Sequence, residues 1–160
     1  MRVLFVCSGN TCRSPLAEAI ASTLFGSDGK RSFESAGIEA DEGGPVSPGA
    51  LAVALEIGLD LSGHCARLLA REMIEQADEV YVMTAPQRKS LLHLDALAAP
   101  KVALLDPLGG EIVDPAGGDL ELYRRTREHL RRAIEARFGE LSRGLALPKE
   151  ESSPVGGGGG

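Results

Sequence analysis

The sequence predicts one α/β domain, in which a parallel, doubly wound sheet of four strands carries helices on both faces. Strand-like and helix-like segments alternate along the chain, and parallel strands need such crossovers between them. Residues 2–6 form a β-prone, largely apolar run, which is typical of a strand covered on both faces. A polar loop and a Ser-Pro pair follow this run, so we expect an anion-binding loop between the first strand and the first helix.

The first strand–loop–helix unit covers residues 2–25. Pro15 suits the first position of a helix, because its nitrogen has no hydrogen to leave unpaired, and Ser14 before it is a suitable cap. Apolar side chains then recur every four residues up to Phe25, which predicts a helix with one buried face. The loop that joins the strand to this helix is residues 7–13, CSGNTCR.

The later elements continue the alternation of strands and helices. The other predicted strands are residues 32–38, 79–83 and 101–105. Helices are expected from the Ser47-Pro48 pair to Gly58, over residues 70–76, from the Thr84 cap to about Leu94, and from Asp119 to about Ser142. Residues 39–46 are a predicted loop, and residues 59–68 a predicted connector.

The last predicted helix has the clearest periodicity in the chain. Its expected buried stripe is Tyr123, Thr126, Leu130, Ile134, Phe138 and Leu141, and its Arg and Glu residues are expected to form a solvated face. We therefore predict a domain over residues 1–147, followed by a flexible, glycine-rich tail over residues 148–160.

Composition narrows the class of protein. The 17 basic and 23 acidic residues give a net charge of −6, which argues against nucleic acid or an anionic membrane as a partner. No apolar run has spanning length, and Met1 leads directly into the first predicted strand, so we expect a cytoplasmic protein. Three cysteines without a secretory signal do not indicate a disulfide framework. No spacing indicates a metal site or a cofactor, and none assigns an oligomeric state.

The loop at residues 7–13 combines a thiol with a guanidinium. A helix N-terminus and Arg13 both favour the thiolate form of Cys7, which can then act as a nucleophile. The planar fork of Arg13 matches two oxygens of a phosphoryl group, and loop amides can bind the others. The expected phosphate-binding residues are Ser8, Gly9, Asn10, Thr11, Cys12 and Arg13. This pattern favours phosphoryl transfer to sulfur over an ordinary strand–helix turn with an incidental buried thiol.

Protonation of the leaving group requires a carboxylic acid, and two Asp-Pro pairs supply candidates. These are Asp106-Pro107 and Asp114-Pro115, each followed by a Gly-Gly pair. Asp, Pro and Gly are also ordinary turn residues, so turn formation alone is the alternative interpretation of each pair.

Residues 7–15, CSGNTCRSP, resemble the phosphate loop of the low-molecular-weight protein tyrosine phosphatases. Residues 114–127 resemble the acid loop and last helix of the same family, and the resemblance covers about residues 1–143. It implies phosphorylated protein substrates, a phosphocysteine intermediate on Cys7, and Asp114 as the general acid and later the base.

The resemblance also implies several supporting residues. Ser14 would donate to the thiolate, Asn10 would hold the strained loop, and His64 would support Asn10. Asp78 would lie behind the site, and Cys12 could trap an oxidised Cys7 as a reversible disulfide. Cys65 is interpreted as a core or surface thiol.

Substrate choice depends on the loop residue Thr11. Tyrosine-specific members usually have a branched apolar residue there. Members that act on phosphoarginine resemble this chain in having threonine at that position. Ala116 stands where an aromatic residue often follows the Asp-Pro pair, and residues 126–128, TRE, also resemble the arginine phosphatases. We therefore expect phosphoarginine to be favoured, with phosphotyrosine as the alternative. More distant alternatives are a thiol-dependent arsenate reductase, for which only Cys65 is available further along the chain, and a non-catalytic phosphate-binding module.

Overall fold

The strands of this protein form the predicted four-stranded sheet, as seen in a computed structural model that describes residues 1–139. All three strand pairs are parallel, and the order across the sheet is β2-β1-β3-β4. The strands are β1 (Arg2–Cys7), β2 (Ser32–Gly37), β3 (Glu79–Val82) and β4 (Val102–Leu104). Because β1 lies between β2 and β3, its carboxyl end is flanked by the carboxyl ends of both neighbours.

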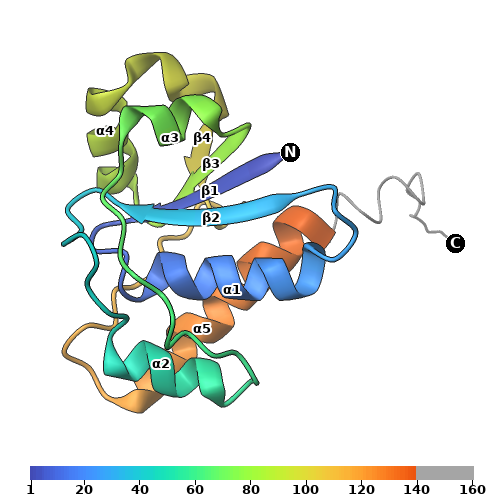
Figure 1. Cartoon of the computed structure of the whole chain (residues 1–160), viewed down its shortest axis with the longest axis vertical. Coiled ribbons are helices and arrows are strands. Elements are labelled where there is room, and N and C mark those ends of the chain that lie inside the picture. The colour runs from blue at the N-terminus through green and yellow to red at the C-terminus, as the bar shows by residue number, and fades with distance from the viewer. Residues whose placement is uncertain (140–160) are drawn as a thin grey trace, which may run out of the picture.

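Helices cover both faces of the sheet, as predicted (Figure 1). One face carries α1 (Arg13–Phe25), α2 (Pro48–Leu55) and α5 (Leu120–Ile134), and the other carries α3 (Arg71–Gln76) and α4 (Ala85–Leu94). Side chains of β1 alternate between these layers, since Val3 and Phe5 join the core under α1 and α5 whereas Leu4 and Val6 join the core under α3 and α4. Two cores explain why the first strand is apolar at consecutive positions.

The start of α1 differs from the prediction. The helix begins at Arg13, two residues before Pro15, and Cys12 occupies the cap position without a capping hydrogen bond from its side chain. Pro15 is tolerated because the N–H groups of a first helical turn have no acceptor within the helix. Ser14 is therefore not the cap of α1, and its hydroxyl is available to the preceding loop.

Two other predicted helix starts are confirmed at the expected residues. Ser47 precedes α2, although its hydroxyl makes no capping hydrogen bond. Thr84 caps α4 with a full capping box, in which its hydroxyl accepts from the Gln87 amide at 3.3 Å and Gln87 Oε1 accepts from the Thr84 amide at 3.2 Å.

The predicted strand at residues 101–105 is shorter in the structure. Residues Ala96–Lys101 form a 3₁₀ helix, so β4 begins only at Val102. The Lys101 ammonium group donates to the Ala77 carbonyl at 2.7 Å, which ties this 3₁₀ helix to the end of α3.

The regular α-helical part of the last helix ends earlier than predicted. Asp119 caps α5 by accepting from the Leu122 amide at 3.0 Å, and α-helical geometry ends at Ile134. A π-helical turn, Glu135–Gly139, follows. The described members of the predicted stripe are all buried: Tyr123, Thr126, Leu130, Ile134 and Phe138. Leu141, the predicted helix end near Ser142 and the predicted tail lie outside the described residues.

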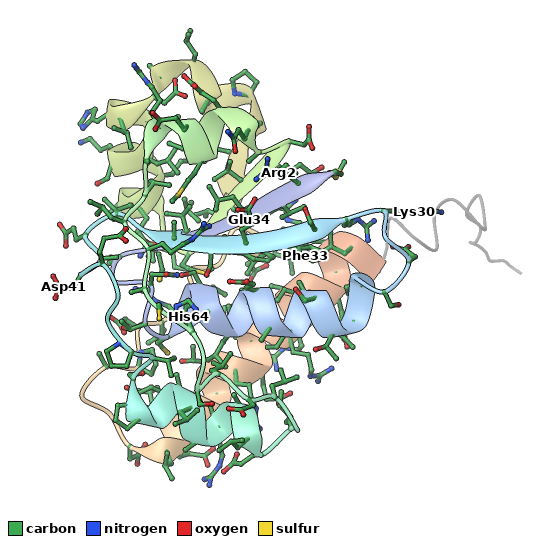
Figure 2. All side chains as sticks on the ribbon, in the orientation of Figure 1. Arg2, Lys30, Phe33, Glu34, Asp41 and His64 are labelled. Carbon is green, nitrogen blue, oxygen red and sulfur yellow. The ribbon has the colours of Figure 1, made fainter. Side chains whose placement is uncertain are left out.

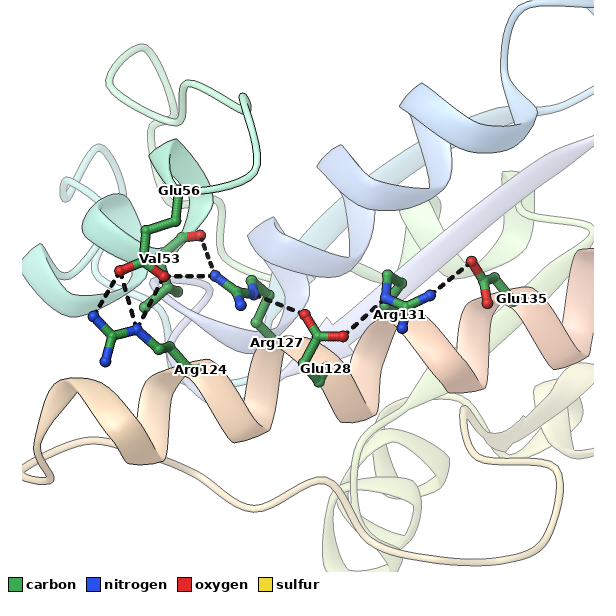
Figure 3. Close-up of polar contacts among 7 residues, drawn as sticks. All are labelled: Val53, Glu56, Arg124, Arg127, Glu128, Arg131 and Glu135. Atoms are coloured by element: carbon green, nitrogen blue, oxygen red, sulfur yellow. Dashed lines mark hydrogen bonds and ion pairs between the residues drawn. The ribbon is translucent and has the colours of Figure 1, made fainter.

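An ion-pair network joins α2 to α5 on the side of α5 that the sequence predicts to be merely solvated (Figure 3). Arg124 binds both oxygens of Glu56, and Arg127 donates to Glu56 at 2.8 Å and to the Val53 carbonyl at 3.0 Å. Hydrogen bonds from Arg124 and Arg127 lower the pKa of Glu56 to about 2. The chain of ion pairs continues along the helix through Glu128, Arg131 and Glu135.

Within residues 1–139, no helix combines the length and the apolar character needed to cross a bilayer.

Phe138 is the centre of an aromatic cluster, and we expect its replacement to weaken the fold. Its fully buried ring meets Phe33 at 5.3 Å, Tyr81 at 5.8 Å and Phe5 at 6.3 Å between centroids. Phe138→Ala should lower the free energy of unfolding by about 3–5 kcal/mol, because it leaves a cavity. Phe138→Leu should cost about 1.5 kcal/mol, because it keeps most of the volume. Urea unfolding followed by circular dichroism measures both, and equal losses would show that packing around the ring is not tight.

Candidate active site

The predicted anion-binding loop lies between β1 and α1, at the carboxyl end of the sheet. Within residues 1–139, Asn10 is the one non-glycine residue with positive φ, at 55°. The end of β2 packs directly on this loop, since a Cβ atom on Gly37 would lie 2.7 Å from the Ser8 carbonyl oxygen and 2.8 Å from the Asn10 nitrogen. Only glycine permits this approach, which brings the loop against the neighbouring strand.

The Cys7 sulfur is held within a buried set of polar groups. Its Sγ lies 2.9 Å from Ser14 Oγ. Asn10 Nδ2 donates to the same Ser14 Oγ at 2.8 Å and to Ser35 Oγ at 3.0 Å. Because Ser14 Oγ accepts from Asn10, its own proton can be donated either to the Cys7 sulfur or to the Ala36 carbonyl, which lies 3.5 Å away. The Ser14 hydroxyl is thus placed where it can donate a hydrogen bond to the sulfur.

Asn10 is fixed by partners from other parts of the chain. Its carbonyl oxygen lies 2.9 Å from His64 Nε2, and its Oδ1 accepts from the Arg67 amide at 2.8 Å. A carbonyl can only accept, so His64 Nε2 carries the proton. Figure 2 shows His64 beside the first turn of α1. Ser35 in turn donates to Glu18 at 2.6 Å, which extends the network into α1.

Arg13 connects the loop to the segment that carries Asp114. Its side chain is buried, and Nη1 donates to the Ile112 carbonyl at 2.9 Å. Its Nη2 lies 3.7 Å from Asp114 Oδ2, whose side chain is 54% exposed. The Ile112 amide donates to the Met83 carbonyl at 3.0 Å, just beyond β3. These contacts bring Asp114 to the mouth of the loop and leave its carboxylate accessible.

Asp106, the other Asp-Pro aspartate, has a different environment. Its Oδ2 lies 2.8 Å from His129 Nε2 of α5, and its Oδ1 accepts from the Leu108 amide at 2.9 Å. The hydrogen bond to His129 is the main reason why the pKa of Asp106 is lowered. Asp106 thus anchors the start of the loop that leads to Asp114, whereas Asp114 itself approaches Arg13.

The structure does not bring Asp78 to the loop. Asp78 Oδ2 accepts from the Arg2 amide at 2.7 Å, at the amino end of β1. Cys7 lies at the other end of that strand, roughly 17 Å away at the usual rise per residue. The sequence-based placement of Asp78 behind the site is therefore wrong, and its carboxylate instead caps the start of β1.

Sequence analysis did not identify Gln87 and Ser35, which both contact the site. The nearly buried Gln87 donates from Nε2 to Ser8 Oγ at 3.2 Å, while its Oε1 accepts from the Met83 amide at 2.9 Å. The Thr84 capping box was a signal for the local role of Gln87, but no local pattern predicts its contact with a loop 79 residues earlier.

The three cysteines are free thiols in distinct surroundings: Cys7 and Cys12 are buried and Cys65 is exposed. Burial, with smaller effects from the negative charges of Cys7 and Asp114, raises the pKa of Cys12 to about 12. Cys12 is therefore a neutral thiol at physiological pH. Among the residues that the structure describes, no group of His, Cys, Asp and Glu side chains is arranged to hold a metal ion.

Comparison with known proteins agrees with this geometry. The family model of low molecular weight phosphotyrosine protein phosphatases matches residues 2–147. The chain belongs to this family. It is thus a protein phosphatase by family, and its loop with Cys7, its buried arginine and Asp114 lie at the places described above.

The relatives differ in the substrates that their names record. A protein-arginine-phosphatase of Bacillus subtilis is 31% identical over 148 residues, which cover 89% of this chain and 98% of that protein. The low molecular weight protein-tyrosine-phosphatase PtpB of Staphylococcus haemolyticus is 35% identical over 132 residues, 81% of this chain and 92% of that protein. An arsenate reductase of Staphylococcus epidermidis is 30% identical over 134 residues, 84% of this chain and 93% of that protein.

A solved structure extends the similarity to three dimensions. An arginine phosphatase variant with serine in place of cysteine, carrying a phosphorylated active-site serine, matches with a TM-score of 0.84 and 30% identity. The match covers 89% of this chain and 97% of that one.

We expect activity to depend on the side chain of Asn10 as well as on its backbone. Asn10→Gly accepts the left-handed conformation but loses the amide, and it should lower kcat at least about tenfold because buried hydrogen bonds to Ser14 and Ser35 are lost. Asn10→Ala should lose similar activity and, in addition, about 1–2 kcal/mol of unfolding free energy through backbone strain. Steady-state hydrolysis of p-nitrophenyl phosphate and urea unfolding measure the two effects. Wild-type kcat in the glycine variant would contradict the role of the amide.

Proposed function

We propose that this chain hydrolyses phosphorylated protein side chains through a phosphocysteine intermediate and favours phosphoarginine. The observation that supports the proposal is the convergence of three groups on one loop: the Cys7 sulfur, the buried Arg13 guanidinium and the Asp114 carboxylate, 3.7 Å from Arg13.

In the first step, the Cys7 sulfur attacks phosphorus while the bond between phosphorus and the substrate nitrogen breaks. Protonated Asp114 gives its proton to that nitrogen, so an unmodified arginine side chain leaves. Arg13 and the loop amides hold the three remaining phosphoryl oxygens as charge redistributes. The hydrogen bond from Arg13 Nη1 to Ile112 leaves other N–H groups of the guanidinium for the phosphate.

In the second step, the phosphocysteine is hydrolysed. The Asp114 carboxylate takes a proton from water, the water oxygen attacks phosphorus, and the bond to sulfur breaks. Inorganic phosphate leaves and Cys7 returns as a thiolate, which the Ser14 hydroxyl at 2.9 Å stabilises. The phosphorylated serine in the related arginine phosphatase supports an intermediate at this position.

Two residues at the site support phosphoarginine over phosphotyrosine. Thr11 directs its hydroxyl toward the loop, since Oγ1 would lie 3.5 Å from a Cβ atom on Gly9. Isoleucine at this position would fill the space of the hydroxyl with a longer apolar arm. Ala116, after the Asp114-Pro115 pair, offers no ring to stack on a phenyl group.

Simple assays distinguish two alternative functions from the proposed phosphatase activity. An arsenate reductase needs resolving thiols, and beyond the loop this chain offers only the exposed Cys65. Arsenate-dependent thiol oxidation would identify such an enzyme. A non-catalytic phosphate-binding module would show no difference between wild type and Cys7→Ser in hydrolysis of a chromogenic phosphate ester.

We expect Asp114, and not Asp106, to be the general acid. Asp114→Asn should lower kcat/KM for a phosphoarginine peptide by about 10²–10⁴-fold, because the leaving nitrogen must be protonated. The loss should be much smaller for p-nitrophenyl phosphate, whose leaving group departs without a proton. Asp106→Asn is the matched control, and it should retain activity within about threefold while it loses stability through the broken contact with His129. The opposite pattern would assign the acid to Asp106.

We expect Thr11 to set the choice of substrate. Thr11→Ile should lower the ratio of kcat/KM for phosphoarginine and phosphotyrosine peptides by about tenfold or more, because the hydroxyl is replaced by apolar bulk. Thr11→Val, which keeps the shape and removes only the hydroxyl, separates the two contributions. An unchanged ratio in both variants would remove Thr11 as the selector.

A further inference from the structure

A groove of about 230 Å³ opens beside the phosphate loop, and one of its lining residues, Glu39, is an acidic residue that the mechanism above does not use. Its walls include Ser8 and Arg13 from the loop, Ile38 and Glu39 from the end of β2, and Pro86 and Gln87 from the start of α4. The groove therefore runs from the phosphate-binding residues to the rim formed by the segment after β2.

The main chain holds Glu39 at this position. Its amide donates to the Ser8 carbonyl at 2.8 Å, and the preceding Ile38 amide donates to the Cys7 carbonyl at 2.9 Å. Gly37, whose lack of a side chain permits this contact, brings both residues against the loop. The location of Glu39 thus follows from the same packing that shapes the nucleophile loop.

The side chain of Glu39 has no partner of opposite charge within residues 1–139. It is exposed, and none of the described ion pairs or hydrogen bonds involves its carboxylate. By contrast, Arg13 in the same groove is buried, and it is the group proposed above to hold the phosphoryl group. The lining of the groove thus combines a buried cation, Arg13, with an exposed acidic residue, Glu39, that has no partner of opposite charge among the described residues.

We propose that Glu39 is a specificity-determining residue that binds the guanidinium group of a phosphoarginine side chain while Arg13 holds its phosphoryl group. This proposal rests on the proposed function and names the residue that recognises the guanidinium group of the substrate. A phosphoarginine head is dipolar, with its positive charge next to the phosphorus, which matches an anion beside an anion-binding loop. Ile38 and Pro86 supply apolar surface for the methylene groups of the same side chain.

A phosphotyrosine head does not fit this charge pattern. Its ring carries no positive charge, so the Glu39 carboxylate would only repel the incoming phosphate dianion. Glu39 therefore discriminates by attraction to one substrate and by repulsion of the other, which is the usual way in which a single charge gives specificity.

The test compares Glu39→Gln with wild type on two peptides that have the same sequence apart from the phosphorylated residue and contain no other basic residue. The charge is removed while the shape is retained. The ratio of kcat/KM for the phosphoarginine peptide to that for the phosphotyrosine peptide should fall about 3- to 10-fold, because the change removes an exposed charge pair with one substrate and relieves repulsion of the other. A change of less than about threefold would overturn the proposal.

Asp41 provides the matched control, because it lies on the same segment and its side chain points away from the protein (Figure 2). Asp41→Asn makes the same change in net charge, and the ratio should stay at the wild-type value. An equal fall in both variants would show that general electrostatics, and not the position of Glu39, reads the substrate, and this would overturn the proposal.

Inhibition separates failure of this proposal from failure of the proposed function. The wild-type ratio of the two peptides tests phosphoarginine preference by itself. With p-nitrophenyl phosphate as substrate, free phosphoarginine should inhibit Glu39→Gln about 2- to 5-fold more weakly than wild type, whereas inorganic phosphate should inhibit Glu39→Gln as strongly as wild type or more strongly. Inhibition by phosphoarginine that does not weaken in Glu39→Gln would overturn the role of Glu39, whatever the wild type prefers to hydrolyse.

Discussion

The left-handed backbone of Asn10 is the constraint on which the nucleophile loop depends. A φ of 55° costs a non-glycine residue about 1–2 kcal/mol, and buried hydrogen bonds from the same residue offset that cost. The partners come from three separate places: Ser14 in α1, Ser35 in β2, and the connection before α3, which supplies His64 and the Arg67 amide. The shape of the loop is therefore a property of the assembled sheet and helices.

The nucleophile and the proposed acid have opposite degrees of burial, and this difference suits their roles. Cys7 is buried beside Ser14, which limits the access of water to its sulfur. Asp114 is half exposed, so it can exchange protons with solvent between the two steps. The position of Asp114 near Arg13 depends on the chain two residues earlier. There, the Ile112 carbonyl accepts from Arg13 and the Ile112 amide donates to the Met83 carbonyl.

The charge at the base of the candidate site is opposite in sign to the net charge of the molecule. The chain has a net charge of −6, yet its one buried arginine within residues 1–139 is Arg13, at the base of the site. Two exposed acidic residues lie near it, since Glu39 lines the same groove and the Asp114 carboxylate lies 3.7 Å from the guanidinium. Under our proposals, a phosphate dianion would be attracted by Arg13 and repelled by Glu39, whereas a dipolar phosphoguanidinium group would be attracted by both. Our proposals for Thr11 and Glu39 address the same discrimination, one through a hydroxyl and the other through charge.

The sequence by itself determined the order of strands and helices, the parallel sheet, the loop at residues 7–13 and the stripe of α5, because these depend on apolar periodicity and on local proline and glycine chemistry. It misplaced the start of α1 and the position of Asp78, and it left two Asp-Pro pairs equivalent as far as local chemistry goes. Only the tertiary structure decided that Asp114 meets Arg13 while Asp106 meets His129, and that Gln87 and Glu39 reach the loop. These contacts join residues far apart in the chain, and their geometry is set by which strand ends lie side by side, which no local pattern records.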